Sequence, residues 1–351
     1  MPLARLPRFF GALCVCLASA CISVDAGASQ VPHLSGVHVL QGSQYKFADP
    51  FEIYAVAGRL WITNGGTNQL TVISASTGSV YKVLNPGPYH LWLGGVPLAV
   101  AGNDIWTLGY KTGYLLNLLV ELNGSTGAVI RAINVGTKYN LNSAHAMIVS
   151  GSEMWLGTNT LTEFNLLTGR VVRSISSHVF LPEAIAVAHG DVWEFNAAGG
   201  VTLSEFATSS GKFQRSISLP GTPSSYGGYP PMNMVIVGND LWLPAGSQAF
   251  KISTVTGKVL TRLNKPSYGI GKAMWVVALS NRVWFVNLQA NSVTELNQSS
   301  AALVHVDKGS PYNFENPQAA AVIDGSVWVT NSYQFQSPPT NGGSITVLPA
   351  T

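Results

Sequence analysis

The chain has 351 residues and a formal net charge of +3 at pH 7, and only 10% of its residues are charged against 46% hydrophobic ones. The charges are scattered singly, whereas nucleic-acid binding usually demands a clustered basic face, so we expect no nucleic-acid partner. All three cysteines lie within the first 21 residues, which leaves the rest of the chain without a disulfide. A chain of this length can bury a sufficient core without one.

The first thirty residues predict an export signal. Two arginines begin the segment, and an apolar stretch at 9–20 that is too short to cross a bilayer follows them. Ala26, Gly27 and Ala28 match a small-x-small cleavage site. We therefore predict a signal peptide at 1–28 and a single domain at 29–351.

A bacterial lipoprotein is the alternative. Residues 18–20 before Cys21 resemble a lipoprotein processing box, although Ala18 stands where Leu is preferred. Both routes predict a secreted or extracytoplasmic protein, and only a lipid on Cys21 attaches it to the membrane. No later stretch has the roughly 18 consecutive apolar residues of a membrane span.

A tryptophan that follows an aliphatic residue or methionine recurs seven times. The successive gaps are 45, 49, 38, 49, 42 and 44 residues. The seven residues are Trp61, Trp106, Trp155, Trp193, Trp242, Trp284 and Trp328. A period in the forties built from short apolar strands is typical of a β-propeller with one four-stranded blade per repeat. We therefore predict an all-β fold, a seven-bladed propeller of antiparallel blades.

The turn between the third and fourth strand is the most regular part of each repeat. It reads Thr-Gly or Ser-Gly in five repeats, where glycine supplies the positive φ that a tight turn needs. A basic residue follows that glycine by four positions in four strands. These residues are Lys82, Arg131, Arg173 and Arg215. We interpret them as solvated charges that protect the open edge of each outer strand.

Asparagine stands three residues after the tryptophan in four repeats, at Asn64, Asn196, Asn287 and Asn331. We interpret these residues as turn formers. The sequences Leu-Trp-Ile-Thr-Asn at 60–64 and Val-Trp-Val-Thr-Asn at 327–331 resemble the YVTN-repeat propellers. They are also similar to the streptogramin-lyase-like and NHL-type propellers of secreted bacterial proteins. The resemblance covers about residues 37–348 and implies the fold.

The two ends of the chain predict how the ring closes. The seventh repeat has strands at 319–323, 327–330 and 344–348 but no fourth strand. A spare strand at 36–40 precedes the first repeat. We expect this N-terminal strand to pair with 344–348 and complete the last blade, because closure removes an open sheet edge.

The loops that join one blade to the next carry aromatic residues at every junction. We predict a ligand-binding face around the central channel, since aromatic rings beside Gly and Pro grip apolar or sugar-like ligands. Its residues are Tyr89, Trp92, Tyr139, Tyr229, Tyr268 and Tyr312. The alternative is that these rings wedge between neighbouring blades as packing elements.

Polar side chains stand at the start of the inner strands, near the propeller axis. We predict ligand-binding roles for Asn233, Lys272 and Gln318. Glu52, His145 and Glu183 are the candidates for catalysis, because two carboxylates and a histidine can do acid–base chemistry or hold Ca²⁺ or Mg²⁺. The alternative is that all six only hydrate a water-filled channel. No metal-ligand spacing of a recognised type occurs, so we predict no cofactor.

Two functions follow from these patterns. The first is a non-catalytic binding module, a monomer that presents its aromatic loop face to a small ligand, a glycan or a protein. The second is a channel-mouth lyase or hydrolase. Streptogramin lyases, which the fold resembles, open a cyclic ester with His and Glu on the channel face and a divalent metal. Only His145 matches such a position in this chain, so the sequence favours the binding module.

Overall fold

The computed structural model describes residues 36–85, 87, 91, 97–111, 115–196, 201–222, 232–333 and 342–350. Residues 33–351 form one compact unit. The predicted signal peptide at 1–28 and its alternative processing site at Cys21 lie outside the described residues. Among the residues that are described, no helix combines the length and the apolar character needed to cross a membrane.

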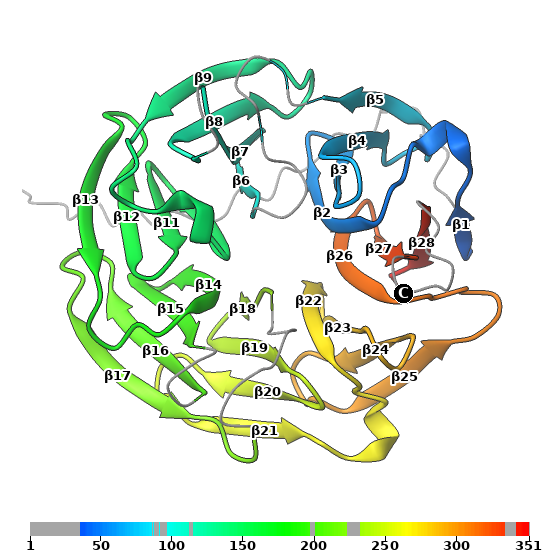
Figure 1. Cartoon of the computed structure of the whole chain (residues 1–351). Helices are drawn as coiled ribbons and strands as arrows, with labels where there is room; N and C mark the ends of the chain where they lie inside the picture. The colour runs from blue at the N-terminus through cyan, green and yellow to red at the C-terminus, as the bar shows by residue number, and fades with distance from the viewer. Residues whose placement is uncertain are drawn as a thin grey trace, which may run out of the picture. The chain divides into compact units, whose positions relative to one another are not determined.

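Seven four-stranded antiparallel sheets follow one another around a ring, as the sequence predicts (Figure 1). Blade 1 contains β2 (Pro50–Val56), β3 (Arg59–Asn64), β4 (Gln69–Ser74) and β5 (Val80–Leu84), and blade 2 contains β6 (Ala99–Ala101), β7 (Asp104–Gly109), β8 (Leu118–Asn123) and β9 (Val129–Asn134). Blade 3 contains β10 (Ala146–Ser150), β11 (Glu153–Gly157), β12 (Leu161–Asn165) and β13 (Arg170–Ile175), and blade 4 contains β14 (Pro182–Ala188), β15 (Asp191–Asn196), β16 (Thr202–Ala207) and β17 (Phe213–Ser218).

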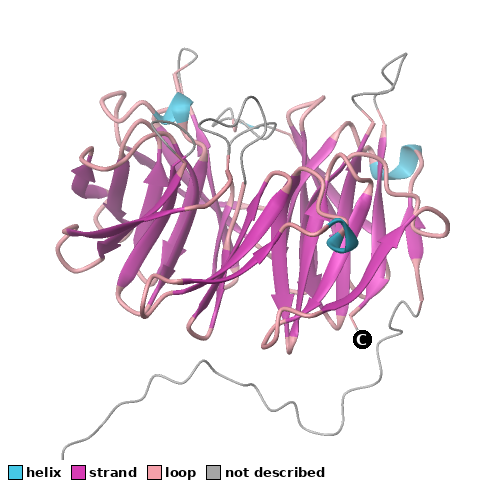
Figure 2. Ribbon diagram, turned by 90° about the horizontal axis from the view of Figure 1, so that it is seen from below, coloured by secondary structure: helices cyan, strands magenta, loops and turns pink. Residues whose placement is uncertain are grey.

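Blade 5 contains β18 (Val235–Val237), β19 (Asp240–Ala245), β20 (Gln248–Ser253) and β21 (Val259–Leu263), and blade 6 contains β22 (Ala273–Leu279), β23 (Arg282–Asn287), β24 (Ser292–Asn297) and β25 (Leu303–Lys308). Blade 7 contains β26 (Pro317–Ile323), β27 (Ser326–Ser332), β28 (Gly343–Pro349) and β1 (His38–Leu40). In the described part of the chain, three 3-10 helices lie in connections that lead into an inner strand: η1 (Ser43–Tyr45), η3 (Leu141–Ser143) and η4 (Pro266–Tyr268). In side view, the strands cross the ring from one face to the other (Figure 2).

The predicted closure of the ring is confirmed. β1 pairs antiparallel with β28, with His38 opposite Val347 and Leu40 opposite Ile345. The N-terminal strand therefore supplies the outer strand of blade 7, although more than 300 residues separate the two partners in sequence. The inner strands β26 and β2 also lie against each other, so blades 7 and 1 are joined near the axis as well.

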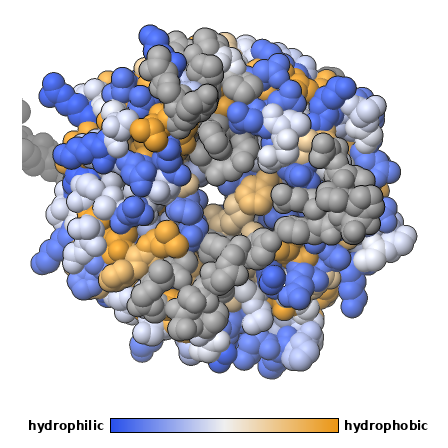
Figure 3. Space-filling view, viewed as in Figure 1, coloured by the Kyte–Doolittle hydropathy of each residue, from blue (hydrophilic) through white to orange (hydrophobic). Residues whose placement is uncertain are grey.

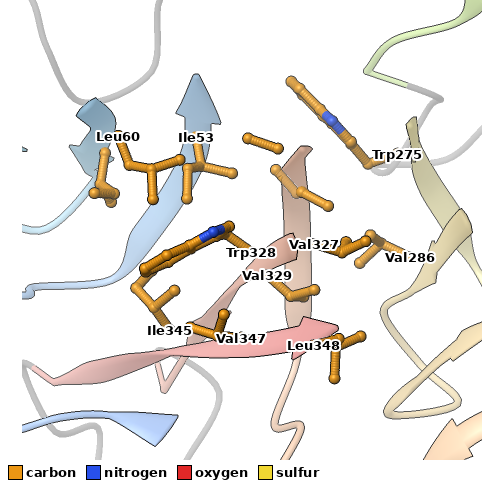
Figure 4. Packing of buried hydrophobic residues seen from close by; sticks show 14 of the residues in the cluster. Ile53, Leu60, Trp275, Val286, Val327, Trp328, Val329, Ile345, Val347 and Leu348 are labelled. Atoms are coloured by element: carbon orange, nitrogen blue, oxygen red, sulfur yellow. The ribbon is translucent and has the colours of Figure 1, made fainter. Parts of the chain in front are cut away.

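The seven repeat tryptophans form the core between blades. None of them is more than 1% exposed. Figure 4 shows one part of this core, where Trp328 lies among buried side chains from blades 1, 6 and 7, including Ile53, Val286 and Ile345. Removing a large aromatic side chain from such a core costs about 3–5 kcal/mol. The tryptophan period therefore reports the packing unit that repeats around the ring.

The Thr-Asn pair at or near the end of β3 and β27 has two structural roles. In β3, Thr63 Oγ1 accepts the backbone N–H of Glu52 at 2.9 Å and so holds the start of the inner strand. Asn64 Nδ2 donates to Thr71 Oγ1 at 3.0 Å, and that hydroxyl donates to the carbonyl oxygen of Tyr45 in the incoming connection. The same pair of contacts recurs in blade 7 around Thr330 and Asn331.

The interpretation of the four asparagines as turn formers is therefore wrong. All four are fully buried within strands, and none has a positive φ. Each donates a hydrogen bond to a Ser or Thr hydroxyl of the third strand. These hydroxyls in turn donate to backbone carbonyls of the preceding connection, so the asparagines tie the inter-blade loops to the blades.

The basic residues of the outer strands also need a correction. Each of the four donates a hydrogen bond to a backbone carbonyl of the next blade, such as Arg131 Nη1 to Leu166 at 2.7 Å. The three arginines are also paired with largely buried glutamates of the third strand, and their side chains are only 23–37% exposed. The three arginines therefore connect neighbouring blades and are not solvated edge charges. Lys82 is exposed and stands opposite Val72 rather than a carboxylate, so it comes closest to the predicted solvated edge charge.

Candidate functional site

The inner strands enclose a cavity of about 260 Å³ near the propeller axis. The space-filling view shows an opening at the centre of the ring (Figure 3). Six blades contribute to the cavity wall. The lining residues are Glu52 and Tyr54 from blade 1, 97–100 from blade 2, 145–149 from blade 3, Ile185 from blade 4, 232–234 from blade 5, and Trp275 from blade 6.

Unequal inner strands make room for this cavity. β6 and β18 have three residues each, whereas β2, β14, β22 and β26 have seven. In blades 2 and 5, irregular segments at 97–98 and 232–234 therefore stand where the other blades continue as a strand. Both segments line the cavity and supply apolar side chains, with Leu98 and Met234 buried.

Glu52 is the most perturbed acid of the cavity wall. Its side chain is buried, and Oε2 accepts a hydrogen bond from Tyr54 Oη at 3.2 Å. Burial raises the pKa of Glu52 to about 8, although hydrogen bonds with Tyr54 and with the backbone of Leu98 partly oppose this shift. At neutral pH, Glu52 is therefore a neutral carboxylic acid. Burial and the neighbouring Glu52 also raise the pKa of Tyr54 well above its usual range, so the phenol keeps its proton.

A β-bulge places Glu52 in this position. The register between β2 and β3 shifts between Pro50 and Ile53, so β2 carries one extra residue at the point where Glu52 stands. Bulges re-aim side chains and are frequent beside functional sites. The hydrogen bond from the backbone N–H of Glu52 to Thr63 fixes the bulge from the second strand.

His145 and Glu183 form a contact between blades 3 and 4. His145 Nδ1 lies 3.2 Å from Glu183 Oε2, and this hydrogen bond is the main cause that raises the pKa of His145. Glu183 stands in a second bulge, where the register between β14 and β15 shifts between Pro182 and Ala184. Gly157 lets the two blades approach, because a Cβ there would lie 2.7 Å from the carbonyl oxygen of Pro182.

Asn233 lines the cavity, and its amide group forms two hydrogen bonds with the neighbouring blade. Its Nδ2 donates to the carbonyl oxygen of Val276, and its Oδ1 accepts the N–H of the same residue, both at 2.8 Å. This pair of bonds imitates a strand ladder and holds the segment 232–234 against β22. Asn233 therefore shapes the cavity wall, and these two bonds fix the orientation of its amide.

Sequence reasoning missed two aromatic residues of the cavity wall, Tyr54 and Trp275. Their rings meet edge to face, with centroids 6.1 Å apart and planes at 81°. Tyr54 follows Glu52 by two residues in a strand, which is the spacing that places side chains on one face. Trp275 interrupts an inner strand of mostly small and β-branched residues. Both patterns are visible in the sequence.

The other described candidates do not line the cavity. Lys272 is exposed, and Gln318 is buried with its Nε2 donating to the carbonyl oxygen of Asn316 at 3.2 Å. Tyr139, Tyr268 and Tyr312 are half-buried and pack against three different inter-blade core clusters. Tyr89, Trp92 and Tyr229 lie outside the described residues, so the loop-face site stays a prediction.

The geometry brings together four of the six polar candidates and leaves Lys272 and Gln318 apart. Glu52, His145 and Asn233 line one cavity, and Glu183 contacts His145. Within the described residues, no three His, Cys, Asp or Glu side chains are close enough together to hold a metal ion. What the cavity offers a ligand is a neutral carboxylic acid, an imidazole and a largely apolar wall.

No family model matches the chain, and no curated protein matches it. Among solved structures, a streptogramin B lyase is similar over 89% of this chain and 96% of its own, with a TM-score of 0.66 and 16% identity. The computationally designed Ika8 protein matches over 88% and 98%, with a TM-score of 0.59 and 12% identity. BamB from Moraxella catarrhalis matches over 85% and 81%, with a TM-score of 0.52 and 13% identity. At these identities the likeness concerns the fold, and the chain has the fold of a streptogramin-lyase-like β-propeller.

Proposed function

We propose that this protein is a binding module that takes a small ligand into the cavity at the centre of its propeller. The observation that carries the proposal is the composition of the cavity wall. It combines a buried acid and an imidazole with apolar and aromatic side chains from six blades. Ligand sites are concave and mostly apolar, with a few convergent polar groups of perturbed pKa.

The cavity also indicates how large the ligand is. A volume of about 260 Å³ lies just below the range of roughly 300–1,000 Å³ that drug-sized ligands occupy. A small organic molecule fits it, whereas a folded protein or a long glycan reaches only its mouth. We place the binding function in the channel, with Tyr54 and Trp275 as its aromatic residues, and the predicted loop face as a second surface.

We further propose that the protein acts outside the cytoplasmic membrane. This part rests on the sequence of residues 1–28 and on the fold likeness to BamB. Either signal-peptide cleavage or lipidation of Cys21 delivers it there. Mass spectrometry of the N-terminus of the protein isolated from its own cells separates the two routes, and an intact Met1 contradicts both.

A second candidate function is acid–base catalysis, and the contact between His145 and Glu183 favours it. A carboxylate that holds one imidazole nitrogen leaves the other nitrogen free to move a proton, and Glu52 supplies a neutral acid in the same cavity. A lyase or a hydrolase uses such a pair. Turnover of small esters or lactones that His145→Ala and Glu183→Gln both abolish supports this candidate over simple binding.

The binding function is tested by closing the cavity. Ligand-observed NMR with a library of small organic molecules should give hits for the wild type, and Ile148→Trp should remove them because Ile148 is half-buried on the cavity wall. Val172→Trp is the matched control, since it adds the same ring on the outer strand β13, where Val172 is 45% exposed. Thermal unfolding shows whether each variant is folded.

The outcomes separate the two proposed surfaces. Hits that Ile148→Trp removes and the control retains support the channel cavity. Hits that survive Ile148→Trp but are lost in Trp92→Ala or Tyr229→Ala overturn the cavity and support the loop face. Hits that survive every one of these substitutions contradict both surfaces.

A further inference from the structure

The polar groups of the cavity differ in what they can still offer to a ligand. Oε2 of Glu52 already accepts from Tyr54, and the backbone of Leu98 bonds the same carboxyl group. Asn233 uses one N–H and one lone pair of its amide in the two bonds with Val276, which fix the orientation of the amide. The Nδ1 atom of His145 is paired with Glu183. Besides the rest of this fixed amide, the groups open to a ligand are the carboxylic O–H of Glu52 and the second ring nitrogen of His145.

Both remaining groups are hydrogen-bond donors at mildly acidic pH. A neutral carboxylic acid has one O–H to donate, and a protonated imidazole donates from both nitrogens. The other described lining residues are apolar apart from Tyr54, whose O–H bonds Glu52, and Asn233. Glu52 and His145 therefore both offer hydrogen-bond donors to a ligand in the cavity.

The charges around Glu52 also favour its neutral form, which donates a hydrogen bond. The titratable groups of the described cavity wall are Glu52, Tyr54 and His145, with Glu183 behind His145, and the lining residues of blades 2, 4, 5 and 6 contribute none. β2 also packs against β26 and β27, which carry no titratable side chain, and against β3, whose Arg59 stands opposite Val56. Among the described lining residues no Lys or Arg compensates an ionised Glu52, so the cavity wall disfavours the carboxylate form.

We propose that the cavity selects small molecules with an apolar body and a carbonyl or carboxylate group, which accepts hydrogen bonds from Glu52 and His145. The inference rests on the proposed function, because it specifies the ligand class of the same cavity. An acceptor group satisfies the donors that the protein leaves open, and the apolar body meets Leu98, Ile185 and Trp275. An amine of the same size offers only donors and requires Glu52 to ionise first.

Three probes of equal size test this selectivity: phenylacetate, phenylacetamide and phenethylamine. At pH 6 we expect the amide and the carboxylate to bind at least about tenfold more tightly than the amine, the difference that one or two hydrogen bonds make. At pH 9, where Glu52 is ionised, we expect the order of amide and amine to reverse. Phenylacetamide is uncharged at both pH values, so any change in its affinity belongs to the protein. Calorimetry or NMR titration measures all three.

Two variants assign the effect to Glu52. Glu52→Gln keeps a hydrogen-bond donor but cannot ionise, so the amide should lose less affinity between pH 6 and pH 9 than it does in the wild type, and the loss that remains belongs to the deprotonation of His145. Glu194→Gln is the matched control, because Glu194 is also buried with a pKa raised to about 8 but does not line the cavity. It should keep the reversal. Circular dichroism at both pH values checks that the variants stay folded.

The failures are distinguishable. Equal binding of all three probes that Ile148→Trp abolishes overturns the ligand class and leaves the cavity as the site. Tighter binding of the amine than of the amide at pH 6 also overturns the ligand class, and it indicates that the cavity binds cations. Binding that Ile148→Trp does not change overturns the inference together with the cavity. The absence of binding by every probe overturns the ligand class, while the library screen decides on the cavity independently.

Discussion

His145 Nδ1 of blade 3 lies 3.2 Å from Glu183 Oε2 of blade 4, so a single hydrogen bond crosses the boundary between two blades at the channel cavity. The backbone of His145 is fixed as well, because its N–H donates to the carbonyl oxygen of Gly157 at 2.9 Å. One ring nitrogen is therefore committed and the other is left for chemistry or binding. Pre-organisation of this kind reduces the cost of ordering the side chain when a ligand arrives.

Replacing the carboxylate should lower the pKa of His145. The hydrogen bond and the negative charge of Glu183 both raise that pKa in the folded protein, while partial burial lowers it. In Glu183→Gln we expect the pKa to fall below its wild-type value, which NMR titration of the His145 ring measures. An unchanged pKa contradicts the role given to Glu183.

The raised pKa of His145 also makes the stability of the fold depend on pH. A histidine whose folded pKa lies above its unfolded value stabilises the fold fully below pH 6.5, and this contribution is lost as the pH rises through the folded pKa. Glu183→Gln should therefore lower the melting temperature more at pH 5.5 than at pH 8.5.

Glu52→Gln should stabilise the protein at alkaline pH. The pKa of Glu52 is about 8 when folded and 4.5 in its ordinary state, so the folded protein binds a proton that the unfolded chain has lost between these values. Stability falls as the pH rises through this window. Removal of the carboxyl should restore at most about 5 kcal/mol at pH 8, an upper bound set by about 1.4 kcal/mol per unit of pKa. Denaturant unfolding at pH 5 and pH 8 measures it, and the gain should shrink to less than about 1 kcal/mol at the lower pH.

The inter-blade arginines should matter for stability. In Arg131→Met the largely buried Glu121 loses its partner and the carbonyl of Leu166 loses a donor, so we expect a loss of about 1–3 kcal/mol. Lys82→Met is the matched control, because Lys82 is exposed and faces Val72 rather than a carboxylate. It should cost less than about 1 kcal/mol. Equal losses in the two variants contradict the account of these ties.

Removal of the N-terminal strand should open the ring. A chain that lacks residues 29–45 loses the pairing between β1 and β28 and leaves the edge of blade 7 unpaired. We expect a lower melting temperature and a broader transition in calorimetry. A truncated protein that melts like the full domain shows instead that the contacts between the inner strands β2 and β26 suffice for closure.

The sequence predicts the scaffold better than the site, for physical reasons. Tryptophans that pack between blades must recur with the blade period, so the spacing from Trp61 to Trp328 is enough to predict the ring. Bulges leave no such period. Those at Glu52 and Glu183 break the alternation from which side-chain direction is inferred, so the burial of Glu52 could not be derived.

The hydrogen-bond partners of residues in the outer and second strands show a related limit of prediction from sequence. The alternation places Arg131 on an outer strand correctly, but its partner Glu121 lies on the neighbouring strand and its acceptor Leu166 in the next blade. Such partners depend on the register between strands and on the approach of two blades, neither of which a single sequence states. Asn64 illustrates the same point, because its partners come from the connection before β2 and from β4.

A crystal structure of the protein with one of its small-molecule ligands tests the central claim most directly. The account predicts density for the ligand inside the channel cavity, with an acceptor atom within hydrogen-bond distance of Glu52 or His145 and the apolar body against Trp275. Density at the loop face or on the outer strands, with the channel cavity left unchanged, would contradict it.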